Sequence, residues 1–160
     1  MSKNHYYQRM ELEIVNLFGK RKNIIIPNCF IEWGTATDHE CDILIIKPSG
    51  YAIEVEIKMS VSDFKADMKK KHSHINEKLR QLYYAMPENV FDACKHDIPD
   101  YAGVLILYNY DNFERVKELK YAPKKEARKL TIEEQNKLMR TGIMKYWNLK
   151  ESYHKEKSIY

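Results

Sequence analysis

The stretch YAIEVEIKMSVSDF, Tyr51 to Phe64, decides how this chain folds. Side chains of a β-strand point alternately to its two faces, so the apolar residues of IEVEIK share one face. The other face then carries Glu54, Glu56 and Lys58 side by side. Taken alone, such a triplet is better explained by a solvated strand face than by a functional site, and the residues around it must decide.

The preceding stretch, CDILIIKP, is a second strand signal, and the loop Pro48 to Gly50 between the two strands predicts a hairpin. A three-residue loop places Asp42 opposite Glu56. It also places Leu44 opposite Glu54. Directly opposed side chains share a face and lie about 5 Å apart. Two carboxylates at that distance repel each other unless a positive charge lies between them, and a divalent cation, which prefers oxygen ligands, would supply it.

The remaining elements follow from hydrophobic periodicity and from turn and capping residues. The order is a helix over 6–18, an edge strand over 23–34, the hairpin 41–58, a helix from 60 to about 80, strand 81–87, short helix 88–95, buried strand 101–109 and a helical C-terminal part from about 131. The segment 117–129 is basic and is predicted to be irregular. This order predicts an α/β sandwich, a single domain over 1–160, with a mixed central sheet of about five strands flanked by helices.

Composition sets limits on the class of protein. The 160 residues are 44% hydrophobic and 31% charged, which predicts one folded domain. The net charge of +4 permits a polyanionic partner without requiring one. No apolar run of membrane-spanning length and no signal peptide is visible, so no membrane association is expected. Three widely spaced cysteines, Cys29, Cys41 and Cys94, predict reduced thiols in the cytoplasm and argue against a four-cysteine metal site.

The ordered set of Asp42 followed by Glu56-Ile57-Lys58 resembles the PD-(D/E)xK nuclease superfamily. More specifically, the chain resembles the MmcB-like DNA-repair proteins and related phage proteins. Those proteins pair a V-E-I-K strand with an S-x-x-D-F-x-x-D helix, followed by YYA-x-P and P-x-x-A/G-G-L-I strands; this chain has IEVEIKMSVSDFKAD, YYAMP and IPDYAGVLI. The resemblance runs from about Cys41 to Leu130 and implies a restriction-endonuclease-like fold. Cys41 stands where the superfamily motif has proline.

The resemblance implies a metal-dependent nuclease that hydrolyses phosphodiester bonds in double- or single-stranded DNA, in DNA repair or phage recombination. Asp42, Glu56 and the backbone carbonyl of Ile57 would bind Mg²⁺ or Mn²⁺. Lys58 would orient and polarise the attacking water. Further candidate ligands are Glu54 and one acid of the first helix, Glu11 or Glu13.

Residues around this set are predicted to have supporting roles. Ser60 is predicted to cap a helix, with Asp63 as the capping-box acid, and both Asp63 and Asp67 would lie behind the metal ligands. His72 and His74 are two residues apart, which is the wrong spacing for chelation from one helix face. Basic side chains on two segments would contact phosphates in a nuclease, although a solvated surface is their default explanation. They are Lys69, Lys70, Lys71, Lys124, Lys125 and Arg128.

A second hypothesis places the chain in another class of protein: a catalytically inactive nucleic-acid-binding or protein-interaction module on a nuclease fold. The intact set of Asp42, Glu56 and Lys58 favours the enzyme. A purely structural α/β protein leaves the two opposed acids unexplained. The sequence leaves open DNA against RNA, endonuclease against exonuclease action, and a homo-oligomer or protein partner.

Overall fold

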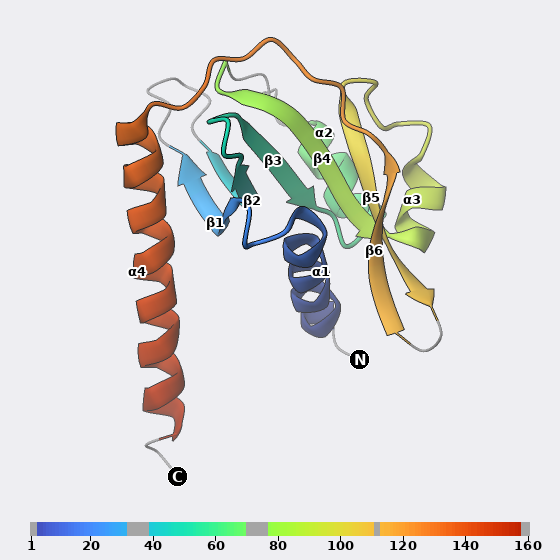
Figure 1. Ribbon diagram of the computed structural model, residues 1–160. Coiled ribbons are helices and arrows are strands. Elements are labelled where there is room, and N and C mark those ends of the chain that lie inside the picture. Colours follow the sequence, from blue (N-terminus) through green and yellow to red (C-terminus); the bar gives the residue numbers. More distant parts are fainter. Residues whose placement is uncertain (1–2, 32–38, 70–76, 111–112, 158–160) are drawn as a thin grey trace.

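The computed structural model describes residues 3–31, 39–69, 77–110 and 113–157 (Figure 1). Ten elements follow one another along the chain. They are α1 (Lys3–Phe18), β1 (Ile24–Ile31), β2 (His39–Ile46), β3 (Ala52–Ile57), α2 (Val61–Met68), β4 (Leu79–Pro87), α3 (Glu88–Cys94), β5 (Ala102–Tyr110), β6 (Phe113–Lys120) and α4 (Ile132–Lys157).

The strands form one mixed sheet in the order β1-β2-β3-β4-β5-β6. β3, β4 and β5 are parallel, and the other neighbouring pairs are antiparallel. Parallel neighbours need a crossover connection, and α2 and α3 lie in the two connections of this sheet. The predicted single-domain α/β fold with a mixed sheet is therefore confirmed, with one strand more than the sequence indicated.

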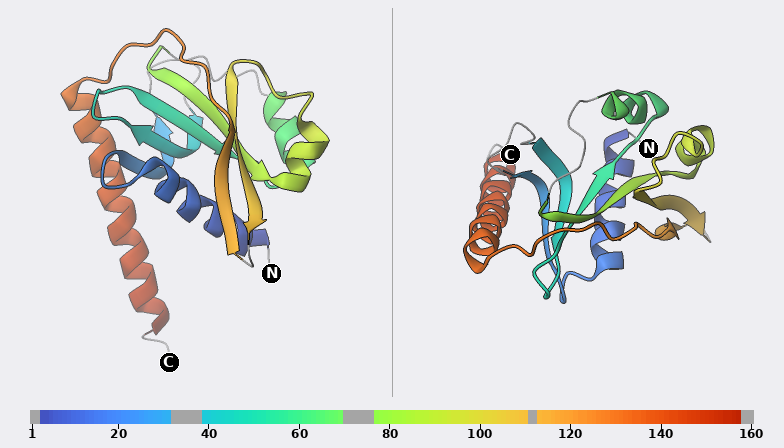
Figure 2. Two further views of the ribbon diagram at one scale, coloured as in Figure 1. Left: turned by 45° about the vertical axis from the view of Figure 1, so that its right-hand side comes forward. Right: turned by 90° about the horizontal axis from the view of Figure 1, so that it is seen from above.

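Helices cover both faces of the sheet (Figure 2). On one face, Met10 and Ile14 of α1 pack against apolar side chains of β3 such as Val55. On the other face, Phe64 of α2 packs in a cluster with Tyr84 of β4. α4 lies beside β1 and extends past the edge of the sheet (Figure 1). None of the described helices is both long and apolar enough to cross a membrane.

The β2–β3 hairpin has the predicted register, with Leu44 opposite Glu54. The backbone N–H of Gly50 donates to the carbonyl of Lys47 at 2.8 Å, which closes the three-residue loop. Gly50 has φ +84°, a left-handed conformation that glycine adopts without a steric penalty. The turn residues therefore set the register that alternation alone leaves free.

The helix predicted from residue 60 begins where expected but ends earlier. Ser60 is the N-cap of α2, and its hydroxyl accepts a hydrogen bond from the backbone N–H of Asp63 at 3.2 Å. The carboxylate of Asp63 accepts from the N–H of Met59, not from that of Ser60. α2 ends at Met68, and Leu79 begins β4, so the predicted helix end near residue 80 is wrong.

The segment 117–129 also differs from its prediction in part. Residues 117–120 belong to β6, and the irregular path begins at residue 121. β6 is an edge strand paired only with β5, and Val116 is its contact with the core. Charged residues such as Lys117 and Glu118 have low strand propensity but suit an edge, because they oppose pairing with another chain. Backbone pairing with β5 outweighs that local preference.

Candidate active site

The charged triplet on β3 is buried. Glu54 is 0% exposed, Glu56 is 5% exposed, and Lys58, directly after the end of the strand, is 4% exposed. A solvated strand face is therefore not the explanation of this pattern. Burying charged groups is costly unless they are paired with one another or bind ions.

Lys58 lies between two carboxylates. Its Nζ is 2.7 Å from Oε2 of Glu56 and 3.2 Å from Oδ1 of Asp67 in α2. Burial by itself would lower the pKa of Lys58, but the charges of Glu56, Asp67 and Asp42 together outweigh it and the pKa is raised. Lys58 is therefore an ammonium ion at neutral pH. In this state it can donate hydrogen bonds and stabilise negative charge, but it cannot accept a proton.

Glu56 carries the strongest electrostatic conflict of the site. Burial, followed by the charges of Glu54 and Asp42, raises the pKa of Glu56 to about 7, although Lys58 acts in the opposite direction. One oxygen of Glu56 bonds to Lys58, while the other, Oε1, is buried and has no hydrogen-bond partner among the described residues. The site thus holds more negative charge than Lys58 balances, and one carboxylate oxygen is available to a ligand.

Asp42 reaches the end of β3 in a way that the sequence did not predict. The regular β2–β3 pairs run only as far as Ile43 and Val55, one step short of the predicted Asp42–Glu56 pair. Oδ2 of Asp42 instead accepts a hydrogen bond from the backbone N–H of Ile57 at 2.7 Å. Its other oxygen accepts from the hydroxyl of Tyr7 in α1 at 3.2 Å. Burial raises the pKa of Asp42 despite these contacts.

An irregularity in β1 accompanies this placement. The β1–β2 pairs include Cys29 with Cys41 and Pro27 with Ile43 but skip Asn28, which has φ +47° and would face Asp42. Cys41, the residue before Asp42, is buried in a cluster with Leu44, so strict alternation does not hold here. Burial, with the charge of Glu54 next, raises the pKa of the Cys41 thiol well above its usual value. Cys41 is thus a neutral neighbour of the acids.

Of the two first-helix acids, Glu11 lies beside the site. Burial and the charge of Asp42 raise its pKa. Glu13 is buried but forms ion pairs with Arg9 at 3.1 Å and Arg115 at 3.4 Å. Glu13 is therefore engaged toward β6, and Glu11 is the candidate that remains close to Asp42.

The two α2 acids have different surroundings. Asp67 is 4% exposed, contacts Lys58, and accepts a hydrogen bond from the hydroxyl of Tyr84 at 3.4 Å. Asp63 is exposed at the first turn of α2, and its charge contributes to the raised pKa of Asp42. Asp67 thus supports Lys58 directly, whereas Asp63 acts as a helix-capping residue near the site.

The predicted basic residues do not form one group. Lys125 is half-buried, and burial lowers its pKa. The charge of Glu54 acts in the opposite direction, which places Lys125 near the acidic face. Arg128 forms two hydrogen bonds with Glu134, at 2.9 Å and 2.7 Å, and one with Glu77 at 3.2 Å, so its guanidinium is engaged within the protein. Lys69 is exposed, Lys124 lines a separate cavity, and Lys70, Lys71, His72 and His74 lie outside the described residues.

The oxygen donors of the site meet part of the requirements of a hard divalent cation. Within the described ranges, no three His, Cys, Asp or Glu side chains are grouped closely enough to form a metal site by themselves. Mg²⁺ often uses only one or two carboxylates and takes its other ligands from water and substrate phosphate. Asp42, Glu56 and the carbonyl of Ile57 offer oxygen donors of that kind, and the free Oε1 of Glu56 fits such an ion.

Tyr7 and Cys41 were missed as residues of the site. The hydrogen bond of Tyr7 to Asp42 depends on the tertiary fold, because Tyr7 comes from α1. The burial of Cys41 in the cluster with Leu44 accompanies the break in alternation beside Asn28. The position of Cys41 beside the predicted ligand Asp42 was the only sequence signal for either residue.

Comparisons with known proteins define the fold class and no more. No family model matches the chain, and no curated protein matches it. A solved structure with a similar fold is the SPO1766 protein of unknown function from Silicibacter pomeroyi. It is 19% identical, and the match covers 94% of this chain and 92% of that chain with a TM-score of 0.61. The chain therefore belongs to the class of single-domain α/β proteins with an open mixed sheet.

Proposed function

We propose that this protein is a metal-dependent nuclease that hydrolyses phosphodiester bonds in DNA. The observation that carries the proposal is the buried ammonium of Lys58 between Glu56 and Asp67, in a site with excess negative charge. The resemblance of its Asp42 and Glu56-Ile57-Lys58 pattern to the PD-(D/E)xK superfamily supports the same function.

The residues of the site would divide the work as follows. An ammonium ion has three donors, and two of those of Lys58 are directed to Glu56 and Asp67. The third is left for a water molecule or a phosphate oxygen. Mg²⁺ or Mn²⁺ would supply Lewis acidity and lower the pKa of a bound water. Tyr7 and the N–H of Ile57 hold the carboxylate of Asp42 in place.

The substrate and setting belong to the same proposal. The net charge of +4 is compatible with a polyanion, and the half-buried Lys125 beside the acidic face would contact a phosphate of the bound strand. DNA repair or phage recombination is the proposed setting. A cytoplasmic location fits the free thiols of Cys29, Cys41 and Cys94.

The test is a cleavage assay with plasmid DNA, single-stranded DNA and RNA. We expect the wild-type chain to cleave DNA with Mg²⁺ or Mn²⁺ and to be inactive with EDTA. The variant Asp42→Asn should lose activity, because it weakens both the charge and the acceptor at the proposed ligand. Lys65→Ala, an exposed change on α2, serves as the matched control and should cleave like wild type. Cleavage that persists in EDTA would contradict the proposal.

One observation favours the second function, an inactive nucleic-acid-binding or protein-interaction module. In the part of the chain that the structure describes, no ready-made group of three metal-ligating side chains is present. Such a module would bind DNA or a protein without turnover. Tight binding of DNA by wild type, with no cleavage of any substrate in any of the metals, would support this function over the nuclease.

A further inference from the structure

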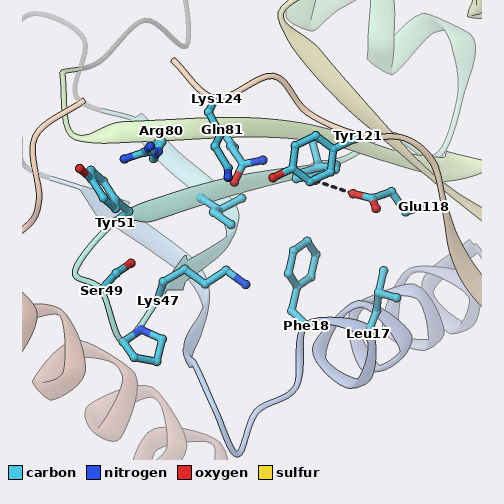
Figure 3. Close-up of a pocket in the computed structure, with 13 residues that line it drawn as sticks. Leu17, Phe18, Lys47, Ser49, Tyr51, Arg80, Gln81, Glu118, Tyr121 and Lys124 are labelled. Carbon is cyan, nitrogen blue, oxygen red and sulfur yellow. Dashed lines mark hydrogen bonds between the residues drawn. The ribbon is translucent and has the colours of Figure 1, made fainter. Parts of the chain in front are cut away.

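Figure 3 shows a cavity of about 760 Å³. It lies at the other end of the parallel strands from Lys58. Tyr51 before the start of β3 and Arg80 at the start of β4 line it, whereas Lys58 follows the end of β3. Ile53 and Tyr83, on the α1 face of the sheet, form part of its wall. The volume is in the range of small-molecule sites, roughly 300–1,000 Å³. The cavity is separate from the proposed active site.

Three basic side chains line this cavity: Lys47, Arg80 and Lys124. Among the described residues, none of the three forms an ion pair with a carboxylate. The guanidinium of Arg80 lies 3.8 Å from the centre of the Tyr51 ring, which holds its planar donors in place. Nζ of Lys47 lies 5.6 Å from the centre of the Phe18 ring. The cavity lining therefore has more cationic than anionic side chains, and two of its three cations, Arg80 and Lys47, lie near aromatic rings.

The lining is polarised. Arg80 and Tyr51 lie together on one side of the cavity, and Glu118 and Tyr121 lie on the other (Figure 3). Glu118 is held by a hydrogen bond from the hydroxyl of Tyr83. A ligand that fills the cavity would therefore meet the guanidinium of Arg80 at one end and the carboxylate of Glu118 beside Tyr121 at the other. The ammonium groups of Lys47 and Lys124 lie between these ends.

We propose that this cavity binds a nucleoside monophosphate. The phosphate would lie between Arg80 and Lys47, with Lys124 adding charge, because a planar guanidinium binds phosphate through two parallel hydrogen bonds. The base would stack beside Phe18 and Tyr121, and its amino group would donate to Glu118. A base with an exocyclic amino group, such as adenine, can donate that group to Glu118, whereas uracil has no amino group and offers only its ring N3–H.

The same chemical group occurs in a free mononucleotide and at the 5′-phosphorylated end of a DNA strand. The test uses isothermal titration calorimetry with the full chain and five probes: AMP, adenosine, UMP, and a short oligodeoxyadenylate with and without a 5′-phosphate. We expect AMP to bind at one site. The affinity for adenosine should be lower than that for AMP by about tenfold or more, and the affinity for UMP should be lower by about fivefold. Binding of the phosphorylated oligonucleotide without binding of AMP would assign the site to strand ends.

Variants separate this cavity from the surface and from the active site. Arg80→Gln should weaken AMP binding about tenfold or more, and Lys47→Gln provides a second variant in case Arg80→Gln unfolds. Lys65→Gln, on the opposite face, should bind AMP like wild type. Lys58→Ala should also bind AMP unchanged, so loss of nuclease activity does not affect the result. No binding of AMP or of the phosphorylated oligonucleotide, or binding that both cavity variants leave unchanged, would overturn the proposal.

Discussion

Glu56 shows how a single residue connects the fold to the proposed chemistry. Its position on β3 buries it beside Glu54, and the contact with Lys58 satisfies only one of its two oxygens. A carboxylate that a protein needed only for stability would be expected to have both oxygens bonded. The raised pKa and the free oxygen together are typical of functional sites.

The pH dependence of stability tests this electrostatic account. Burial, followed by the charge of Glu54, raises the pKa of Glu56 from its usual 4.5 to about 7 in the folded chain. Below pH 4.5 the carboxyl group is protonated in the folded and in the unfolded chain. Above pH 7 it is ionised in both states, and only the folded chain buries the charge. Its contribution to stability therefore falls as the pH rises from about 4.5 to 7, by on the order of 3 kcal/mol.

Glu56→Gln removes this titration. We expect its free energy of unfolding, measured by urea denaturation without divalent ions, to change less between pH 5 and pH 8 than that of wild type. Glu126→Gln replaces an exposed carboxylate in the irregular segment and should keep the wild-type dependence. The same difference in stability between the two pH values in all three proteins would contradict the raised pKa of Glu56.

At this scale the sequence predicted the residue types of the site better than their contacts. Alternation on β3 placed Glu54, Glu56 and Lys58 together, because every second residue of a strand shares a face. The contact of Asp42 with Tyr7 joins residues 35 apart in sequence, and only tertiary packing determines it. The bond from Ile57 N–H to Asp42 was likewise hidden, because it depends on where the regular pairing ends.

At the scale of elements, α2 positions Asp67 against Lys58, so its N-terminus matters to the site. Ser60→Ala removes the acceptor for the N–H of Asp63 and should lower the free energy of unfolding by about 1 kcal/mol. Ser152→Ala, an exposed change within α4, is the control and should stay within about 0.5 kcal/mol of wild type. Chemical denaturation of both variants measures the difference, and equal stabilities would contradict the capping role.

Gly103 allows β5 to lie close under the ring of Tyr83 on β4. A Cβ at this position would lie 2.5 Å from a ring carbon of Tyr83 and 2.6 Å from the backbone nitrogen of Ala122. Gly103→Ala should therefore destabilise the protein by roughly 1–3 kcal/mol. Gly142→Ala in α4 meets only ordinary contacts and should stabilise it by about 0.5–1 kcal/mol. Thermal unfolding that moves both variants in the same direction would show that this packing argument is wrong.

The elements that the sequence predicted correctly are those whose local signals agree with the tertiary fold. The hairpin is one case, since Gly50 at the turn and the alternation of both strands select the same register. The start of α4, predicted at about residue 131, is another: Thr131 and Glu134 form a capping box there, and both of its hydrogen bonds are present. β6 was missed because its charged residues have a low local preference for a strand. The end of α2 was placed too late because the apolar residues continue at helical spacing beyond Met68.

At the scale of the whole molecule, the parallel strands separate two sites of different charge. The buried acids with Lys58 lie at the end of β3, and the cationic cavity with Arg80 lies at the start of β4. The core clusters between these ends make the sheet a rigid support for both. Changes at one site are therefore expected to leave the other intact, which allows each proposal to be tested separately.

The central claim is that Lys58 acts in the chemistry of a metal-dependent nuclease. Its most direct test is the single-turnover rate of DNA cleavage by Lys58→Ala, with Mg²⁺ binding measured on the same sample. Removal of the ammonium should lower the rate by on the order of 10²-fold or more, while Mg²⁺ binding persists because Asp42, Glu56 and the Ile57 carbonyl remain. A variant that cleaves DNA at the wild-type rate would contradict the claim.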